Sequence, residues 1–130
     1  MPQIYLGYLK SEDESKDEAL VVEKYISGKY EKYINNTGIN QSNCDATRLE
    51  KAECLAHFSY HWSENKLLLV DIQGAGYTLY DPEIATSVDE SEVDGEARFT
   101  MGNLRGEAIK KFVDGHLCND YCRMLGLELI

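Results

Sequence analysis

The stretch His116-Leu-Cys118-Asn-Asp-Tyr-Cys122 lies near the end of the chain and holds three potential metal ligands within seven residues. Nitrogen and sulfur side chains suit a borderline-soft cation such as Zn²⁺, which takes four of them. Upstream, Asp71-Ile-Gln73-Gly-Ala-Gly-Tyr-Thr-Leu-Tyr-Asp81-Pro82 offers carboxylate and amide oxygens, which suit Mg²⁺ and bound phosphate. Two kinds of metal ligand in neighbouring stretches indicate phosphoryl transfer on a metal-stabilised fold.

The composition sets limits on the partners. A chain of 130 residues with 43% hydrophobic and 28% charged side chains can bury one modest core, so we expect one domain. Its formal net charge of −10 argues against nucleic acid or an anionic membrane as a partner, and a basic peptide remains compatible. The chain shows no secretion signal or apolar span, and its four cysteines suit a reduced metal-binding protein, so we expect a cytoplasmic location.

Two acidic stretches divide the sequence. Ser11–Glu18 separates the apolar runs Ile4–Leu9 and Ala19–Val22, which we predict to be two strands joined by a solvated loop. Ser87–Glu96 precedes Gly102-Asn-Leu-Arg-Gly106 and is a candidate contact for a basic partner. For the most part, these charges are expected to be solvated surface.

Apolar periodicity predicts the remaining elements. Steps of three and four residues predict a helix over about Thr47–His61. The continuous apolar run Lys66–Gln73 predicts a strand buried on both faces. A further helix is predicted from Leu104 to Val113, with Asn103 as its N-cap, and a last short one over Cys118–Leu125.

The cysteine spacing is informative but not decisive. On a helix, Cys118 and Cys122 would face one side, with Cβ atoms about 5–6 Å apart, and His116 could turn toward them. Two buried free cysteines would give the same spacing. His57 and His61, four residues apart on the predicted helix, compete as the fourth ligand.

The oxygen ligands are also open to two interpretations. Asp71 and Gln73 are two residues apart on an extended segment, so they share a face, and the glycine turn after them can bring Asp81 near. This arrangement suits a hard cation that keeps water and phosphate as further ligands. An aspartate before a glycine turn is, however, commonly only a turn or cap residue.

From about Val22 to Leu127 the chain resembles the C-terminal part of an alpha-kinase, a family of atypical serine/threonine protein kinases. The resemblance lies in ordered blocks: Val22-Glu-Lys-Tyr-Ile-Ser-Gly-Lys-Tyr-Glu-Lys-Tyr-Ile-Asn-Asn36, Ala56-His-Phe-Ser-Tyr60, Val70-Asp-Ile-Gln-Gly74, Tyr80-Asp-Pro82, Gly102-Asn-Leu104, and His116-Leu-Cys-Asn119 with Cys122. It implies an α+β fold, the C-terminal lobe of an atypical protein-kinase-like domain with a structural zinc site.

The resemblance also implies a role for each matching residue. Asp71 corresponds to the catalytic aspartate, and Gln73 and Asp81 correspond to Mg²⁺ ligands. The other correspondences are Glu23 and Tyr25 at the hinge that meets the adenine of ATP, Lys32 and Asn36 in the nucleotide and metal cleft, His57, His116, Cys118 and Cys122 at zinc, and Gly102, Asn103 and Gly106 in a loop near phosphate and substrate.

The chain departs from the family pattern at several positions. Lys24 replaces the usual proline after the hinge glutamate, Ile34 an asparagine, and Tyr80 a threonine. Arg105 stands where a glycine usually follows Asn-Leu, with Gly106 one position later, which disfavours close backbone approach to phosphate.

These observations give one expected domain over residues 1–130, with residual N-lobe strands and hinge in 1–26 and the C-lobe in 27–130. We find no lysine that corresponds to the phosphate-gripping residue of the N-lobe. The expected function is an ATP-dependent serine/threonine kinase, incomplete in this chain, acting on a protein or basic peptide with Mg²⁺ and a structural Zn²⁺. The alternatives are a zinc-stabilised pseudokinase or protein-binding module, and an unrelated small zinc domain.

Overall fold

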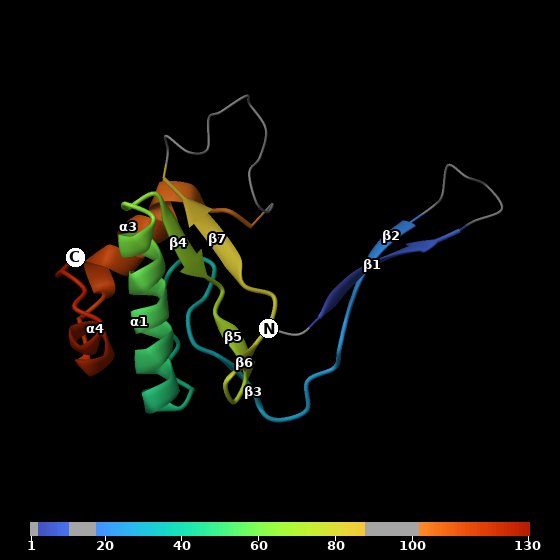
Figure 1. Cartoon of the computed structure of the whole chain (residues 1–130), viewed down its shortest axis with the longest axis horizontal. Coiled ribbons are helices and arrows are strands. Elements are labelled where there is room, and N and C mark those ends of the chain that lie inside the picture. Colours follow the sequence, from blue (N-terminus) through green and yellow to red (C-terminus); the bar gives the residue numbers. More distant parts are fainter. Residues whose placement is uncertain (1–2, 11–17, 88–101) are drawn as a thin grey trace.

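The computed structural model describes residues 3–10, 18–87 and 102–130. Its main body is a helical layer on a two-stranded antiparallel sheet, formed by β4 (Leu67–Val70) and β7 (Glu83–Thr86). The helix α1 (Ala46–Trp62) packs on β4, α3 (Arg105–Gly115) packs on β7, and the short α4 (Asp120–Met124) packs against α1 (Figure 1).

A second, smaller sheet lies beside this body. Its strands are β3 (Tyr30–Lys32), β5 (Gln73–Ala75) and β6 (Thr78–Leu79), antiparallel in the order β3-β5-β6. The turn Gly76–Tyr77 joins β5 to β6, as the glycine pattern predicted, and Gly76 has a φ of 60°. The core between helices and sheets holds the buried apolar side chains of Tyr33, Ile34, Ala52, Ala56, Leu68, Val70, Ile72, Ala85, Ala108, Ile109 and Phe112.

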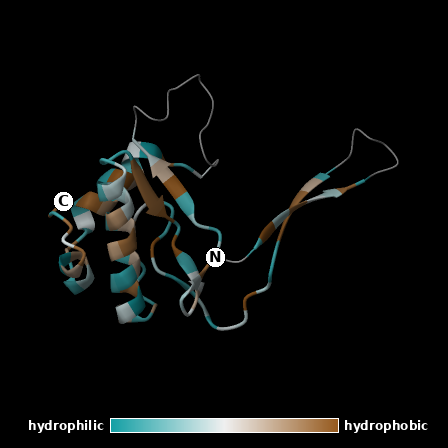
Figure 2. Cartoon of the chain, in the orientation of Figure 1, coloured by the Kyte–Doolittle hydropathy of each residue, from teal (hydrophilic) through white to brown (hydrophobic). Residues whose placement is uncertain are grey.

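A two-stranded hairpin extends away from this body (Figure 1). It consists of β1 (Ile4–Leu9) and β2 (Glu18–Glu23), which confirms the predicted pair of strands. Figure 2 shows hydrophobic residues along the hairpin, and its large apolar side chains are mostly exposed, for example Leu6 at 63% and Val21 at 73%. Isolated hairpins are marginally stable in water, so packing elsewhere in the described chain contributes most of the stability.

The long helix was predicted to within a residue at each end. Asp45 caps its start by accepting a hydrogen bond from the Arg48 N–H at 2.9 Å. Two other helix predictions need correction. The N-cap of α3 is Leu104, not Asn103, whose side chain instead bonds to β7. The last helix begins at Asp120, because Asn119 caps it, so Cys118 lies before the helix rather than in it.

The predicted strand Lys66–Gln73 is two strands in different sheets. The chain leaves β4 after Val70 because Asp71 adopts a left-handed backbone with a φ of 51°, and β5 starts only at Gln73. The expectation of burial on both faces was also wrong, since Leu67 and Leu69 are only partly buried while Leu68 and Val70 are fully so.

Among the described residues, no helix combines the length and apolar character needed to cross a bilayer. The loop predicted between the first two strands falls largely, and the second acidic stretch almost wholly, outside the described ranges.

Candidate functional site

Asp71 lies at the junction of the two sheets, on the bend between β4 and β5. Its N–H donates to the Asn35 carbonyl at 3.3 Å, and the next carbonyl, that of Ile72, accepts from the N–H groups of Tyr33 at 2.9 Å and Ile34 at 3.2 Å. The segment after β3 therefore fastens the bend from one side. A left-handed aspartate held by such contacts is typical of a functional position.

The predicted oxygen ligands gather around this bend. The Gln73 amide nitrogen lies 3.2 Å from Asp71 Oδ2 and 3.3 Å from the carbonyl oxygen of Asp81, which also has a left-handed φ of 50°. Lys32 Nζ lies 2.6 Å from Asp71 Oδ1, and this hydrogen bond raises the pKa of the lysine. The structure thus brings Lys32, Asp71, Gln73 and Asp81 together.

The amide of Gln73 is held at its other end by Tyr30, whose hydroxyl donates to Oε1 at 2.7 Å. In this arrangement the amide oxygen, the atom that Mg²⁺ requires, faces Tyr30 rather than Asp71. Rotating the amide by half a turn would present the oxygen to Asp71 and Asp81. Tyr30 was not predicted as a site residue, because the pairing of β3 with β5 that places it here is a tertiary feature.

Glu83 is a second side chain that the sequence did not reveal. It is the first residue of β7, pairs with Val70 in the sheet and therefore lies beside Asp71. Burial, followed by the nearby charges of Asp71 and Asp81, raises the pKa of Glu83. A side chain at Gly102 would meet this carboxylate, since a Cβ there would lie 2.3 Å from Glu83 Oε1.

Asn103, in the predicted phosphate loop, is tied to β7. Its Oδ1 accepts from the Thr86 N–H at 3.1 Å and from the Arg105 N–H at 2.9 Å, and its Nδ2 donates to Thr86 Oγ1 at 3.0 Å. This side chain fixes the loop to the sheet. Gly106 lies in the first turn of α3.

The predicted hinge residues line a cavity of about 300 Å³. Glu23, Tyr25 and Tyr80 contribute to its wall, with Lys24 and Ile26. The Tyr80 ring lies 6.1 Å from the Tyr30 ring, centroid to centroid, and Tyr30 bonds to Gln73. The hinge cavity therefore adjoins the Asp71 cluster through two tyrosines.

Asn36 occupies the turn after β3, half-buried. The neighbouring Asn35 organises that turn, because its Oδ1 accepts from the Thr37 N–H, the Thr37 hydroxyl at 2.7 Å and the Ile39 N–H. Gly38 then lies against α3, where a Cβ would come within 2.4 Å of the Ala108 carbonyl.

The four predicted zinc ligands come together where α1 meets the C-terminal part of the chain. The donor atoms of His57, His116, Cys118 and Cys122 all lie within 4.8 Å of one another. Cys118 Sγ is 3.6 Å from His57 Nδ1, and Cys122 Sγ is 3.6 Å from His116 Nε2. Metal–ligand bonds of about 2.0–2.3 Å in a tetrahedron imply ligand separations of about 3.3–3.8 Å. The two 3.6 Å pairs have this separation, and the two imidazoles and two thiols are the ligand types that Zn²⁺ takes.

The electrostatics of this cluster favour metal binding. Burial, with the neighbouring His57 as a second cause, lowers the pKa of His116 to about 4, and burial lowers the pKa of His57. Both imidazoles are then neutral near pH 7, the form that coordinates metal. The competing His61 is exposed at the end of α1 and stays outside the cluster.

Cys54 was not predicted to belong to this region. It lies on α1 one turn before His57 and is only 4% exposed. Burial first, and then its interaction with Cys122, including a side-chain hydrogen bond, raise the pKa of Cys54 to about 12. The sequence signal was weak, since a cysteine in a helix commonly fills core space.

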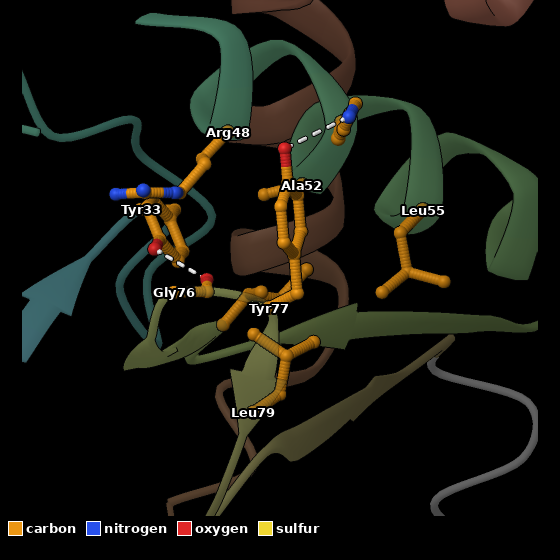
Figure 3. Close-up of a pocket in the computed structure, with 9 residues that line it drawn as sticks. Tyr33, Arg48, Ala52, Leu55, Gly76, Tyr77 and Leu79 are labelled. Carbon is orange, nitrogen blue, oxygen red and sulfur yellow. Dashed lines mark hydrogen bonds between the residues drawn. The ribbon is translucent and has the colours of Figure 1, made fainter. Parts of the chain in front are cut away.

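Another cavity, of about 190 Å³, lies between α1 and the β5–β6 turn (Figure 3). Its cations already have partners: Arg48 Nη1 donates to Glu31 Oε2 at 2.8 Å, and Lys51 Nζ donates to the Tyr77 hydroxyl at 3.1 Å. The Tyr33 hydroxyl donates to the Gly76 carbonyl at 3.2 Å across it. No predicted site residue lines this cavity.

The chain is similar in sequence to known protein kinases. The sequence profile of the alpha-kinase family matches residues 2–122. Myosin heavy chain kinase B of Dictyostelium discoideum is 37% identical over 116 residues, which are 89% of this chain and 14% of that protein. Eukaryotic elongation factor 2 kinase of Mus musculus is 38% identical over 106 residues, 82% of this chain and 13% of the relative.

Solved structures give the same result. The apoenzyme alpha-kinase domain of myosin-II heavy chain kinase A aligns with a TM-score of 0.79 and 27% identity, covering 98% of this chain and 47% of that domain. An inactive variant of the domain in complex with ATP aligns with a TM-score of 0.73 and 28% identity, over 91% of this chain and 42% of that one. The chain thus spans less than half of the solved domain.

Proposed function

This chain belongs to the alpha-kinase family, and we propose that it carries the acceptor-binding and metal-binding part of the active site of an ATP-dependent serine/threonine protein kinase. The observation that carries the proposal is the cluster of Lys32, Asp71 and Gln73 beside the hinge cavity. Conversely, an unrelated small zinc domain is ruled out by the family match and by the closeness of His57 to the cysteines.

In this proposal Asp71 orients the acceptor hydroxyl and takes its proton. Its carboxylate is 13% exposed, so it reaches solvent while remaining fixed by Lys32 and by the Gln73 amide. Lys32 Nζ lies 2.6 Å from Asp71 Oδ1, so the ion pair holds the carboxylate in place. Positioning of this kind provides much of the catalysis in phosphoryl transfer.

Gln73 and Asp81 would hold Mg²⁺, which when bound offsets negative charge on the phosphates of ATP. The residues suit Mg²⁺ because they offer an amide oxygen and a carboxylate. The Gln73 amide already lies 3.3 Å from the main-chain carbonyl of Asp81, whose side chain is exposed. Glu23 and Tyr25 line the cavity proposed to receive the adenine, and Asn36 belongs to the adjoining turn. Gly102 and Gly106 have no side chains, so they take up little space in the loop proposed to lie near phosphate and substrate.

Zn²⁺ would be structural, held by the two imidazoles and the two thiolates behind α1. The ligands come from three parts of the chain: α1 carries His57, the segment between α3 and α4 carries His116 and Cys118, and α4 carries Cys122. The metal would therefore fasten the C-terminal helices to the longest helix. Metal analysis of the native protein should find about one equivalent of zinc, and Cys122→Ser should lose it.

Nucleotide binding by this chain tests the proposal directly. Calorimetry with ATP should give binding that strengthens with Mg²⁺ for the native chain. Asp81→Asn should weaken the Mg²⁺-dependent part by at least about tenfold, since a charge-assisted contact contributes about 1.5–3 kcal/mol. His61→Ala, an exposed change remote from the cluster, is the matched control and should bind like the native chain.

Phosphate transfer to a basic peptide separates the kinase from its alternative. We expect slow or absent turnover by this chain alone, because it spans only 47% of the solved domain. Robust turnover that disappears in Asp71→Ala would show that this chain alone is sufficient for phosphate transfer. Equal absence of Mg²⁺-nucleotide binding in the native chain and in both aspartate variants would favour a zinc-stabilised binding module.

A further inference from the structure

One acidic side chain on α1 joins two segments that are distant in sequence. Glu53 Oε1 accepts a hydrogen bond from the Asn40 side-chain amide, and Glu53 Oε2 accepts one from the Asn119 side-chain amide at 3.5 Å. Asn40 lies 13 residues before Glu53, and Asn119 lies 66 residues after it. All three residues are half-buried. Glu53 therefore connects the segment after β3 with the segment that begins α4.

The Asn119 end of this connection belongs to the proposed zinc centre. Asn119 lies between the ligands Cys118 and Cys122, and its Oδ1 caps α4 by accepting from the Cys122 N–H at 3.2 Å. Because the cap uses Oδ1, the Nδ2 group is directed to α1, where it donates to the Glu50 carbonyl at 2.8 Å as well as to Glu53. α1 thus fixes the orientation of an amide that lies between two ligands.

The Asn40 end belongs to the turn that holds Asp71. Residues 35–40 form this turn, which is closed by an antiparallel bridge between Ile34 and Asn40. The Asn35 carbonyl, at the start of the turn, accepts from the Asp71 N–H at 3.3 Å. A displacement of Asn40 would therefore reach the Asp71 backbone through the 35–40 turn.

We propose that Glu53 is a positioning residue that holds the 35–40 turn and the proposed zinc centre in one arrangement, so that zinc binding and the backbone at Asp71 both depend on its carboxylate. The inference rests on the proposed zinc centre and concerns a residue outside the four-ligand set. A carboxylate suits this position because two amide donors need two acceptor atoms, and an ionised carboxylate offers acceptors only. Glu53 acts on both sites through its asparagine partners.

Zinc affinity, measured by competition with a chromophoric chelator, tests the metal end. Glu53→Met keeps the length of the side chain without its acceptors, and it should weaken zinc binding at least about tenfold, as loss of outer contacts of a metal site commonly does. Glu53→Gln should recover most of the affinity, since its amide oxygen accepts from Asn119 and its amide nitrogen donates to Asn40 once the Asn40 amide turns. Glu50→Met is the matched control, because the Glu50 side chain is exposed and its carbonyl bond to Asn119 is retained.

Amide hydrogen exchange of the zinc-loaded chain tests the other end. At saturating zinc, the Asp71 amide should exchange several-fold faster in Glu53→Met than in the native chain, because the turn that accepts from it is loosened. The amides of the β4–β7 ladder should keep their native rates, which separates a local effect from a general loss of stability. Glu50→Met should exchange like the native chain throughout.

Moving the carboxylate to the other side of the contact gives a rescue that packing alone would not give. Asn40→Asp places a second carboxylate against Glu53, so it should weaken zinc binding and speed exchange at Asp71. In the double variant Asn40→Asp/Glu53→Gln, the introduced carboxylate accepts from the glutamine amide, and both properties should return toward their native values. Equal losses in Glu53→Met and Glu53→Gln would overturn the proposal, as would a double variant no better than Asn40→Asp.

Failure of the zinc centre itself would look different. In that case Cys122→Ser would leave the zinc content of the protein unchanged, and the inference about Glu53 would fail with the centre. If Cys122→Ser loses zinc while Glu53→Met keeps native zinc affinity and native exchange at Asp71, the zinc centre stands and only the inference about Glu53 is wrong. An effect at one end alone would also overturn it, since Glu53 would then not join the two sites.

Discussion

Replacing Arg105 with glycine should stabilise this protein, although the change removes a charged side chain and adds flexibility. Arg105 begins α3 with a φ of 54°, in the left-handed region. That conformation costs an L-residue about 1–2 kcal/mol, and glycine does not have this cost. The side chain is exposed, and the bond from its N–H to Asn103 Oδ1 at 2.9 Å belongs to the main chain and survives the substitution.

The expected gain is the difference between two effects. Relief of the left-handed backbone contributes about 1–2 kcal/mol, and the greater freedom of glycine in the unfolded chain removes roughly 0.5–1 kcal/mol. The net increase in the free energy of unfolding is then about 0.5–1 kcal/mol, or a rise of a few degrees in melting temperature. Thermal and urea unfolding of the native chain and the variant, at equal zinc loading, measure it.

The preceding residue provides a matched control. Leu104 caps the same helix with an ordinary φ of −82°, so Leu104→Gly gains no backbone relief. It removes an apolar side chain that is only 38% exposed, and it should lose about 1 kcal/mol. The two neighbouring glycine substitutions should therefore have opposite signs. A loss at Arg105 as large as that at Leu104 would refute the reasoning that the backbone there is strained.

Three further predictions follow from single contacts. Gly38→Ala should destabilise the protein by more than about 2 kcal/mol, because the new Cβ meets a main-chain carbonyl, whereas Gly115→Ala meets nothing and should be nearly neutral in urea unfolding. Tyr30→Phe should strengthen Mg²⁺-nucleotide binding a few-fold in calorimetry, by releasing the amide oxygen of Gln73; unchanged affinity would contradict the amide rotation. Glu83→Gln should raise the free energy of unfolding at pH 7 but not below about pH 4. A carboxyl whose pKa is raised on folding destabilises the folded state once the pH rises above the pKa that the carboxyl has in the unfolded chain. A gain that persists at low pH would exclude this cause.

Local signals allowed much of the fold and site to be predicted. The helix over Ala46–Trp62 follows from apolar periodicity, a signal that acts within a few residues. The set of four zinc ligands came from the resemblance to the alpha-kinases, and the grouping of Asp71 with Gln73 came from their spacing on an extended segment. The structure brings both groups of residues together. The donor atoms of the four candidate zinc ligands lie within 4.8 Å of one another, and the Gln73 amide nitrogen lies 3.2 Å from Asp71 Oδ2.

The errors arise where distant segments decide the backbone. Asp71 leaves the strand because the segment after β3 forms hydrogen bonds with the Asp71 N–H and with the Ile72 carbonyl. These partners are distant in sequence, so no local pattern contains the contact. Cys118 lies outside the last helix because Asn119 caps it, and the sulfur reaches the cluster from an extended segment instead. Glu83 and Cys54 were missed because their neighbours come from other elements.

A short series of contacts connects the proposed zinc site to Asp71. His57 and Ser59 are on α1, and the Ser59 hydroxyl oxygen accepts a hydrogen bond from the Leu69 N–H of β4 at 2.8 Å. β4 ends at Val70, directly before Asp71. The proposed zinc would hold α4 and the end of α3 to α1. The same helix bonds to β4, the strand that leads into Asp71, the proposed catalytic residue. A structural metal outside the cleft can in this way influence the geometry within it, through the Ser59–Leu69 hydrogen bond and the strand that follows.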